Sequence, residues 1–223
     1  MAISKRLKTI AKYTEGFSSL ADIACDHGYL GIYAVEQYGL SKVLLTDINP
    51  MPLASAINNC KNKNLENVIN CKLGDGLAPL DEDYEVISIS GIGGMLMKDI
   101  LAKDIIKCQN AKRLILCPNT DLYEVRKFLN DSGFIIDTEE MIFEHKYYEI
   151  IVTHYSGELQ NYSEQELKYG PVLLKKMSEE FVNHYKEQIV LFEKQLQFIN
   201  DFVSKEKLST KINEIKKILG NNL

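Results

Sequence analysis

The sequence predicts an α/β protein in which a doubly wound, mostly parallel sheet ends in an antiparallel hairpin and is followed by a helical hairpin. Five short apolar runs, each closed by turn or polar residues, have the pattern of strands buried in a parallel sheet. Helical patterns long enough for one helix each lie between most of them. Two later strand-like runs have no room for a helix between them, and apolar residues then recur at coiled-coil spacing.

The elements of the α/β region follow one another in a regular order. Residues 3–14 form the first predicted helix, with Ile3, Leu7, Ile10 and Ala11 on one face and basic residues on the other. The expected strands cover residues 19–24, 42–48, 68–75, 84–90 and 113–118. The expected helices that alternate with them cover residues 29–38, 51–62, 95–106 and 121–132. Repeated βα units of this kind place helices on both faces of the sheet.

The end of the sheet differs from its beginning. Residues 134–155 hold two strand-like runs separated by a short polar stretch, which predicts a β-hairpin. A parallel sheet completed by an antiparallel pair is the layout of class I methyltransferases rather than of dehydrogenases, by analogy of fold.

The C-terminal region is predicted to be a separate helical hairpin, so that the chain divides into domains 1–157 and 158–223. Ser163 and Glu166 fit a capping box at the first helix start of this region. A coiled-coil-like seam of apolar residues at steps of three and four then comprises Val182, Tyr185, Ile189, Phe192, Leu196, Ile199, Val203, Leu208, Ile212, Ile215 and Leu219. The turn between two antiparallel helices is expected at residues 204–207.

The purpose of the helical hairpin is open between a structural brace, a dimer contact and a substrate-binding arm. Lysines gather around its turn and second helix, which favours substrate binding slightly. They are Lys205, Lys207, Lys211, Lys216 and Lys217.

Composition limits the class of protein. Hydrophobic residues make up 45% of the chain and charged residues 26%, as in ordinary globular proteins. The N-terminal residues mix charged and apolar side chains, so we expect neither a signal peptide nor a membrane span. The five cysteines are scattered and contain no C-x-x-C pair, which predicts no metal site, no disulfides and a cytoplasmic protein. The net charge of −5 still allows a nucleic-acid partner, because binding needs only a local basic face.

The loop after the first strand runs from Asp22 to Gly31 with the sequence DIACDHGYLG, at the position where an open α/β sheet binds its cofactor. Its glycine pattern suits a dinucleotide poorly, and the carboxylate of Asp26 would repel a pyrophosphate. S-Adenosylmethionine instead has a sulfonium and an ammonium group, which the acids of this loop favour. The predicted cofactor-binding residues here are Asp22, Ala24, Cys25, Asp26, His27 and Gly28.

The next two strands end in further candidate cofactor residues. Asp47, followed by Ile48, comes after the first loop at about the spacing at which an acid reaches ribose hydroxyls. The turn Gly74-Asp75-Gly76 lets the backbone approach a ligand while the carboxylate accepts a bond from an adenine amino group. A helix cap would explain the first acid alone and a tight turn the second. Their joint placement after successive strands favours the cofactor site.

The fourth and fifth strands end in residues predicted to hold the methyl acceptor. A glycine-rich turn after the fourth strand suits a flat group lying against the backbone, although close helix packing would also explain it. The amide of Asn119 can pair with the edge of a base, and Tyr148 of the hairpin can stack on one. The predicted residues on this side are Ser90, Gly93, Gly94, Pro118, Asn119 and Tyr148, and Ser90 and Gly91 are also predicted to bind the cofactor.

Seven strings together resemble the bacterial tRNA (adenine-22, N1)-methyltransferase family, whose members are Rossmann-like class I enzymes. They are SKRLKTIAKY, DIACDHGYLG, GDGL, SGIGGM, LILCPN, YYEIIV and YGPVLL, and their order and spacing cover nearly the whole chain. The chain departs from the family pattern at Ala24, where glycine is frequent, and at Ile92, where methionine is common. The resemblance implies S-adenosylmethionine as the cofactor, tRNA as the partner, and methylation of adenine N1 in the D arm.

The resemblance also implies a mechanism. Adenine N1 holds an in-plane lone pair and attacks the methyl group in line, so no strong base is needed. Ser90 and Asn119 are then candidates for positioning the base, and Asp26 for stabilising the charge that reaches the purine. The candidate phosphate contacts are Lys5, Arg6 and Lys8.

Three other functions remain open from the residues alone. They are a methyltransferase acting on a small molecule, a methyltransferase acting on another RNA, and a non-catalytic nucleotide-binding or scaffold protein. The seam of the helical hairpin closes equally well within one chain or between two, so the sequence allows a monomer or a weak dimer.

Overall fold

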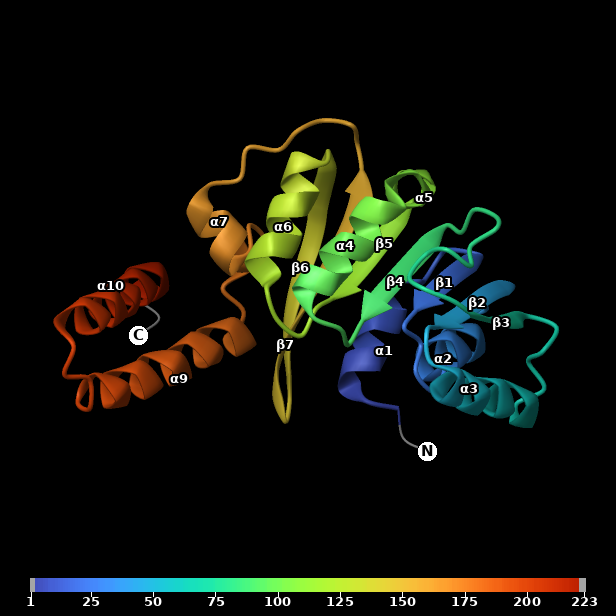
Figure 1. Cartoon of the computed structure of the whole chain (residues 1–223), viewed down its shortest axis with the longest axis horizontal. Coiled ribbons are helices and arrows are strands. Elements are labelled where there is room, and N and C mark those ends of the chain that lie inside the picture. Colours follow the sequence, from blue (N-terminus) through green and yellow to red (C-terminus); the bar gives the residue numbers. More distant parts are fainter. Residues whose placement is uncertain (1–2, 221–223) are drawn as a thin grey trace. The chain divides into compact units, whose positions relative to one another are not determined.

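The computed structural model describes residues 3–220, and a seven-stranded sheet with the order β3-β2-β1-β4-β5-β7-β6 forms the centre of its larger part (Figure 1). The strands are β1 (Ser19–Ile23), β2 (Lys42–Asp47), β3 (Ile69–Leu73), β4 (Val86–Ser90), β5 (Arg113–Cys117), β6 (Phe134–Glu144) and β7 (Lys146–Tyr155). The first five run parallel, and β7 pairs antiparallel with both β5 and β6. The predicted fold class is confirmed.

Helices of the larger part of the chain cover both faces of the sheet. The helices of residues 3–220 are α1 (Lys5–Lys12), α2 (Tyr29–Tyr38), α3 (Pro50–Asn62), α4 (Gly94–Lys103), α5 (Ile105–Asn110), α6 (Leu122–Asp131), α7 (Glu164–Tyr169), α8 (Leu173–Lys176), α9 (Glu179–Leu196) and α10 (Phe202–Leu219). Buried side chains of α1, α2 and α3 form one core with the strands, and those of α4, α5 and α6 form a second core on the opposite face (Figure 1). Within residues 3–220, no helix is both long and apolar enough to cross a membrane.

The strand order creates a crevice at one edge of the sheet. From β1 the chain moves outward through β2 to β3, and then crosses to β4 on the other side of β1. The loops that follow β1 and β4 therefore diverge at the carboxyl ends of these neighbouring strands. A divergence of this kind is where open α/β sheets bind their ligands.

The N-terminal helix α1 is attached to the tip of the β6–β7 hairpin. The hydroxyl of Ser4 accepts a hydrogen bond from the backbone N–H of Leu7 and caps the helix. The carboxylate of Glu144 accepts the backbone N–H groups of Lys5 at 2.6 Å and of Arg6 at 3.1 Å. Burial raises the pKa of Glu144, but these N–H groups, together with the Ser4 side chain and His145, hold the pKa below its ordinary value. The start of α1 thus lies beside the hairpin tip.

A buried ion-pair network attaches the segment after α7 to the sheet. Arg126 of α6 is fully buried and donates to the carboxylates of Glu139, at 2.7 Å, and of Glu149. The backbone N–H of Val172 donates to Glu139 over 2.9 Å. A Cβ atom at Gly170 would lie only 2.6 Å from the Glu139 carboxylate, so this position requires glycine. Gly170 and Val172 of the YGPVLL string therefore pack against the network around Arg126.

The chain forms two compact units, Met1–Val172 and Leu173–Leu223. The boundary expected from the sequence lies at residue 157, before α7, whereas the first unit continues to Val172 because α7 packs against α6. In the second unit α9 and α10 pack against each other, and Lys216 pairs with Glu193 over 2.7 Å.

Two predicted helical segments have different limits in the structure. The single helix expected over residues 95–106 is two helices, α4 and α5, because Asp104 leaves the helical conformation with φ −121° and ψ 41°. The turn of the helical hairpin lies at residues 197–201 rather than 204–207. The carboxylate of Asp201 accepts the backbone N–H of Ser204 over 2.8 Å, which starts α10 earlier than the apolar spacing indicates.

Candidate active site

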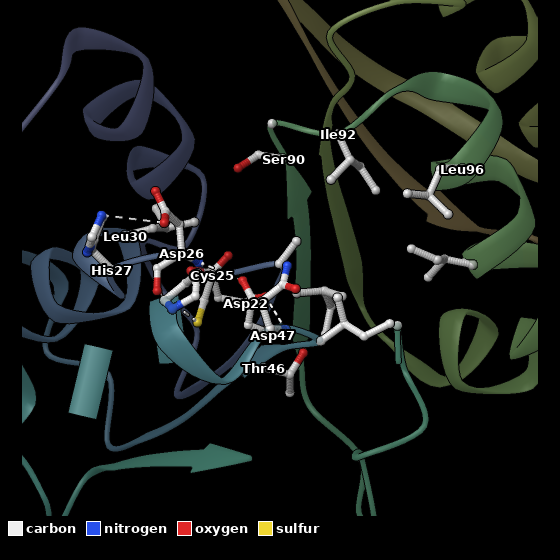
Figure 2. Close-up of a pocket in the computed structure, with 18 of the residues that line it drawn as sticks. Asp22, Cys25, Asp26, His27, Leu30, Thr46, Asp47, Ser90, Ile92 and Leu96 are labelled. Carbon is white, nitrogen blue, oxygen red and sulfur yellow. Dashed lines mark hydrogen bonds and ion pairs between the residues drawn. The ribbon is translucent and has the colours of Figure 1, made fainter. Parts of the chain in front are cut away.

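A cavity of about 650 Å³ opens at the carboxyl ends of β1, β2 and β4 (Figure 2). This volume lies within the range of cofactor sites, roughly 300–1,000 Å³. The turn after β3, helix α1 and the hairpin tip complete its walls. The predicted site residues that line it are Arg6, Asp22, Ala24, Cys25, Asp26, His27, Asp47, Ile48, Gly74, Asp75, Gly76, Ser90, Gly91, Asn119 and Tyr148. The structure thus brings most of the predicted residues together.

Six predicted site residues do not line this cavity. They are Lys5, Lys8, Gly28, Gly93, Gly94 and Pro118. A Cβ atom at Gly28 would lie 2.7 Å from Leu45, and one at Gly94 would lie 2.4 Å from the carbonyl oxygen of Thr120. Both glycines are therefore required for close packing beneath the site, which was the alternative explanation for the glycine-rich turn. The two lysines are exposed on α1.

The loop after β1 holds two non-glycine residues with left-handed backbone conformation. Ala24 has φ 58° and Asp26 has φ 52°, each at a cost of about 1–3 kcal/mol. The loop is held by hydrogen bonds from the backbone N–H of Cys25 to the carbonyl oxygen of Thr46, at 2.9 Å, and from that of Asp26 to the Asp47 carboxylate, at 3.2 Å. Strain of this kind concentrates at ligand sites, and here it shapes the cofactor side of the cavity.

Three carboxylates gather at the same end of the cavity (Figure 2). Asp22 is buried at the end of β1, and burial raises its pKa to about 8, while Arg6 lowers it and Asp47 raises it further. Asp26 is exposed, and its carboxylate lies 3.5 Å from the imidazole of His27. A group of acids in a partly buried site favours a cationic ligand and disfavours phosphates.

The turn after β3 carries a carboxylate that already has a partner. An oxygen of Asp75 accepts a hydrogen bond from Lys103 of α4 over 2.7 Å, and both side chains are exposed. Gly74 is required for packing, because a Cβ atom there would lie 2.2 Å from Pro79, and Gly76 is favoured by its left-handed backbone, with φ 55°. The adenine contact predicted for Asp75 stays a prediction.

Apolar side chains form the wall between the acids and α4. Ile48 is 61% exposed and Leu96 is 53% exposed, although both line the cavity. Ile92 and Ile100 extend the same surface. Large exposed apolar side chains inside a cavity indicate that a ligand covers them. A flat, weakly polar ring such as adenine suits this wall.

A further part of the cavity wall combines an amide, an aromatic ring and two cations. Asn119 donates from Nδ2 to the carbonyl oxygen of Gly91 over 2.6 Å. Its Oδ1 lies 3.5 Å from Nζ of Lys146. The cationic groups of Arg6 and Lys146 lie 5.0 Å and 4.8 Å from the centre of the Tyr148 ring. This wall offers hydrogen-bonding groups for the edge of a base.

Lys146 is the main polar residue of the site that the sequence did not predict. It directly follows the hairpin turn at His145, and its partner across the hairpin is Glu144. Lys146 reaches the cavity only because β6 and β7 are long and carry their turn beyond the carboxyl end of β5. A clue in the sequence is its two-residue spacing from Tyr148, which places both side chains on one face of the strand.

The residues present fit S-adenosylmethionine better than a dinucleotide. The carboxylates match its ammonium and sulfonium groups and its ribose hydroxyls, and the apolar wall matches its adenine ring. The pyrophosphate of a dinucleotide would lie against the same carboxylates and be repelled by them.

Comparison with known proteins agrees with this chemistry. The model of the tRNA (adenine(22)-N(1))-methyltransferase family matches residues 20–222. A Bacillus subtilis tRNA (adenine(22)-N(1))-methyltransferase is 30% identical over 195 residues, covering 85% of this chain and 82% of its own.

Solved structures are similar over almost their full length. A Streptococcus pneumoniae protein in complex with S-adenosyl-L-methionine is 32% identical, with a TM-score of 0.89, and covers 98% of this chain and 100% of its own. The TrmK protein of M. capricolum, in complex with S-adenosylhomocysteine, is 26% identical with a TM-score of 0.85, and the match covers 97% of each chain. The resemblance seen in the sequence is therefore confirmed, and the chain belongs to the tRNA (adenine(22)-N(1))-methyltransferase family.

Proposed function

We propose that the chain transfers a methyl group from S-adenosylmethionine to N1 of adenine 22 in the D arm of tRNA by direct in-line attack. The observation that carries this proposal is the cavity itself, in which acids at the ends of β1 and β2 face a wall of base-pairing groups at the ends of β4 and β5. One side suits a cationic methyl donor and the other a nucleobase. Membership of the family supplies the identity of the acceptor.

The cofactor supplies an electrophilic methyl group on a positively charged sulfur. Adenine N1 has its own lone pair, so the protein needs no general base. Its contribution is to place the two reactants in line, which in well-oriented systems is worth up to roughly 7–11 kcal/mol. The turn from Ser90 to Gly94 and the amide of Asn119 are the proposed positioning groups.

Asn119 is suited to the amino edge of adenine. Its Nδ2 donates to Gly91, and its Oδ1, which accepts a hydrogen bond from Lys146 over 3.5 Å, has a second lone pair for the exocyclic amino group. This contact places the neighbouring N1 atom toward the cofactor side of the cavity. The amide orientation is therefore part of acceptor selection.

Asp26 is proposed to stabilise the positive charge that reaches the purine as the methyl group moves. Its carboxylate is exposed at the cavity and its backbone is fixed by Asp47. A negative charge already in place near the developing cation lowers the barrier without reorganisation.

The target nucleotide must leave its stack to enter the cavity, at a cost of a few kcal/mol. Contacts to the RNA backbone offset this cost. The proposed phosphate contacts are Lys5 and Lys8 of α1 and the lysines of α10. The RNA-binding parts would then be α1 and the C-terminal helical hairpin, which by the boundary predicted from the sequence covers residues 158–223. Binding should weaken as salt rises.

Mapping the methylated nucleotide tests the proposal. Unmodified tRNA carrying adenine 22 is incubated with the protein and S-adenosylmethionine, digested and analysed by mass spectrometry. We expect one 1-methyladenosine at position 22, and none in the same tRNA with guanine at that position. Methylation of another nucleotide, or of a free nucleoside at an equal rate, would contradict it.

We further propose that the protein acts in the cytoplasm as a monomer or a weak dimer. The five cysteines of the chain are free thiols in the structure, as a reducing compartment requires. Light scattering over a range of protein concentrations measures the oligomeric state, and a concentration-independent tetramer would contradict it.

A further inference from the structure

The end of the β6–β7 hairpin is a two-stranded ribbon that projects beyond the carboxyl ends of β4 and β5 (Figure 1). Strand β7 pairs with β5 at Ile151, Val152 and Thr153, and the part of the hairpin nearer the turn continues past β5. The turn lies at His145, which is exposed and has a left-handed backbone with φ 61°. Because side chains alternate along a strand, the ribbon has two distinct faces.

One face of the ribbon is occupied by α1 and the cavity. Ile142 packs in the core with α1, α2 and α3, and Glu144 accepts the N–H groups at the start of α1. Their partners across the hairpin, Tyr148 and Lys146, line the cavity. This face therefore belongs to the site already described.

The opposite face carries an aromatic pair. Phe143 and Tyr147 are partners across the hairpin, with their ring centres 4.9 Å apart and the rings tilted by 57°. Neither residue lines the cavity. Phe143 is 50% exposed, although Met141, on the same face of the same strand, is buried. A ring that is supported by a second ring and open to solvent offers a flat apolar surface to a ligand.

The charges around this pair favour a nucleic acid. The only acid in residues 141–148 is Glu144, and α1 engages its carboxylate on the other face of the ribbon. His145 and Lys146 lie at the turn, and Lys5 begins the helix beside it; all three side chains are exposed. Aromatic rings for stacking, combined with cations that follow the phosphate backbone, are how proteins bind single-stranded nucleic acids.

The position of the pair indicates which base it meets. Lys146 and Tyr148 belong to the wall against which the acceptor adenine is proposed to lie, so the RNA strand passes the hairpin tip on its way into the cavity. When the adenine leaves its stack, the base beside it loses a stacking partner. The ring of Phe143 lies across the ribbon from the cavity, where a strand that crosses the tip places the next base.

We propose that the exposed ring of Phe143, supported by Tyr147, stacks on the nucleobase adjacent to the target adenine. The RNA strand then crosses the hairpin tip, with the target base on one face of the ribbon and its neighbour on the other. The proposal rests on the proposed function, because it assumes a flipped adenine in the cavity. Stacking on the ring replaces the contact that the neighbouring base loses, which offsets part of the cost of flipping. Every base has a face that can stack, so this contact senses the opened strand rather than its sequence.

Binding of tRNA to protein saturated with S-adenosylhomocysteine tests the proposal through a cycle of changes. Phe143→Ala removes the ring, and abasic tRNAs lack the base on the 5′ or the 3′ side of the target adenine. We expect Phe143→Ala to weaken binding of intact tRNA about 5- to 100-fold, and to cause no further loss with one of the two abasic tRNAs. Phe143→Trp should retain binding, because its ring also stacks.

Two controls separate this contact from general effects. Ile106→Ala removes a side chain that is 63% exposed on α5, the helix before the amino end of β5, and should leave tRNA binding unchanged. The affinity of Phe143→Ala for S-adenosylhomocysteine, measured by calorimetry, should equal that of wild-type protein, because Phe143 lies outside the cavity. An unchanged affinity also shows that the variant is folded.

The proposal is overturned if Phe143→Ala has no effect on intact tRNA, or if it causes the same loss with intact tRNA and with both abasic tRNAs. It is also overturned if light scattering shows that Phe143→Ala dissociates a dimer, since a second copy of the chain would then cover the pair. If wild-type protein neither binds tRNA nor methylates adenine 22, the proposed function itself fails. If methylation is found there while Phe143→Ala changes nothing, only the role of Phe143 fails.

Discussion

The side-chain nitrogen of Asn119 donates a hydrogen bond to the carbonyl oxygen of Gly91 across 2.6 Å. This bond joins the end of β5 to the turn after β4 and fixes which way the amide faces. Asn119→Asp replaces the donor with an acceptor, so two oxygen atoms would repel each other and the turn would shift. We expect methyl transfer to slow about 100-fold, as a displacement of roughly 1 Å at a reacting centre does. Single-turnover kinetics with tRNA measure this rate.

The same variant provides its own control, because most of the predicted cofactor residues follow β1, β2 and β3 and are not bonded to Asn119. Calorimetry should give an affinity for S-adenosylhomocysteine close to that of wild-type protein. A variant that loses cofactor binding and activity in parallel would show that Asn119 supports the cofactor site rather than the acceptor base.

Asp26→Asn removes the charge of the proposed electrostatic group and keeps its shape. The carboxylate is exposed and its side chain supports no core packing, so the free energy of unfolding should change little. We expect the single-turnover rate to fall by about 10- to 100-fold, because the cation forming on the purine loses a nearby negative charge. Methyl transfer at the wild-type rate would contradict the role of Asp26.

Cofactor binding is expected to release a proton near neutral pH. Burial raises the pKa of Asp22 to about 8, so its carboxyl group is mostly protonated in the free protein at about pH 7. The ammonium group of the ligand favours the charged form and lowers this pKa, which expels the proton. Affinity should therefore rise from about pH 6 to about pH 8 and then level off.

Calorimetry in buffers with different ionisation enthalpies counts the released protons. Asp22→Asn should abolish the release and flatten the pH dependence. Proton uptake, or an affinity that falls over this pH range, would contradict the assignment of Asp22.

Arg126→Met should destabilise the protein strongly. It leaves Glu139 and Glu149 buried beside each other without their cation, and breaking a buried pair from one side costs about 3–5 kcal/mol. Lys127→Met is the matched control, because its ion pair with Asp131 is exposed and its loss should change stability by less than about 0.5 kcal/mol. Urea unfolding followed by circular dichroism measures both, and equal effects would contradict the structural role of the network.

The salt dependence of tRNA binding tests the lysines of α10. Replacing Lys205, Lys207 and Lys211 with Gln should reduce the slope of log K against log salt by about 2, since each phosphate contact contributes roughly 0.7–0.9. Lys42→Gln with Lys112→Gln, at the amino ends of β2 and β5, is the matched control and should leave the slope unchanged. Equal slopes for all variants would indicate that the helical hairpin is a brace.

The class of the sheet, mostly parallel with an antiparallel hairpin at its end, could be predicted from the sequence because apolar runs alternate with helical patterns and the last two runs have no helix between them. The acids of the site could be predicted for a related reason, since strand ends of a parallel sheet meet at one edge. The ends of helices that are set by a single side chain could not be predicted. Asp201 caps α10 and overrides an apolar spacing that continues to Val203, and Asp104 divides a helix that the periodicity joins.

Contacts between segments far apart in the chain could not be predicted from the sequence either. Gly28 and Gly94 look like ligand-binding glycines in a motif, but each is required by an atom from another element, Leu45 or Thr120. Lys146 has no motif that marks it as a site residue. It lines the cavity only because the long β6–β7 hairpin carries it there.

The β6–β7 hairpin restricts how the length of this chain can change in evolution. Lys146 and Tyr148 face the cavity while Glu149 faces Arg126, so a deletion of one residue near the turn would exchange the two faces. The register shift already present between Ile136 and Thr138 lies far from the turn, where it does not disturb the site. Natural insertions and deletions should therefore occur in the connection at residues 156–162, and hairpins of homologous proteins should keep a constant length from the turn to the Arg126 network.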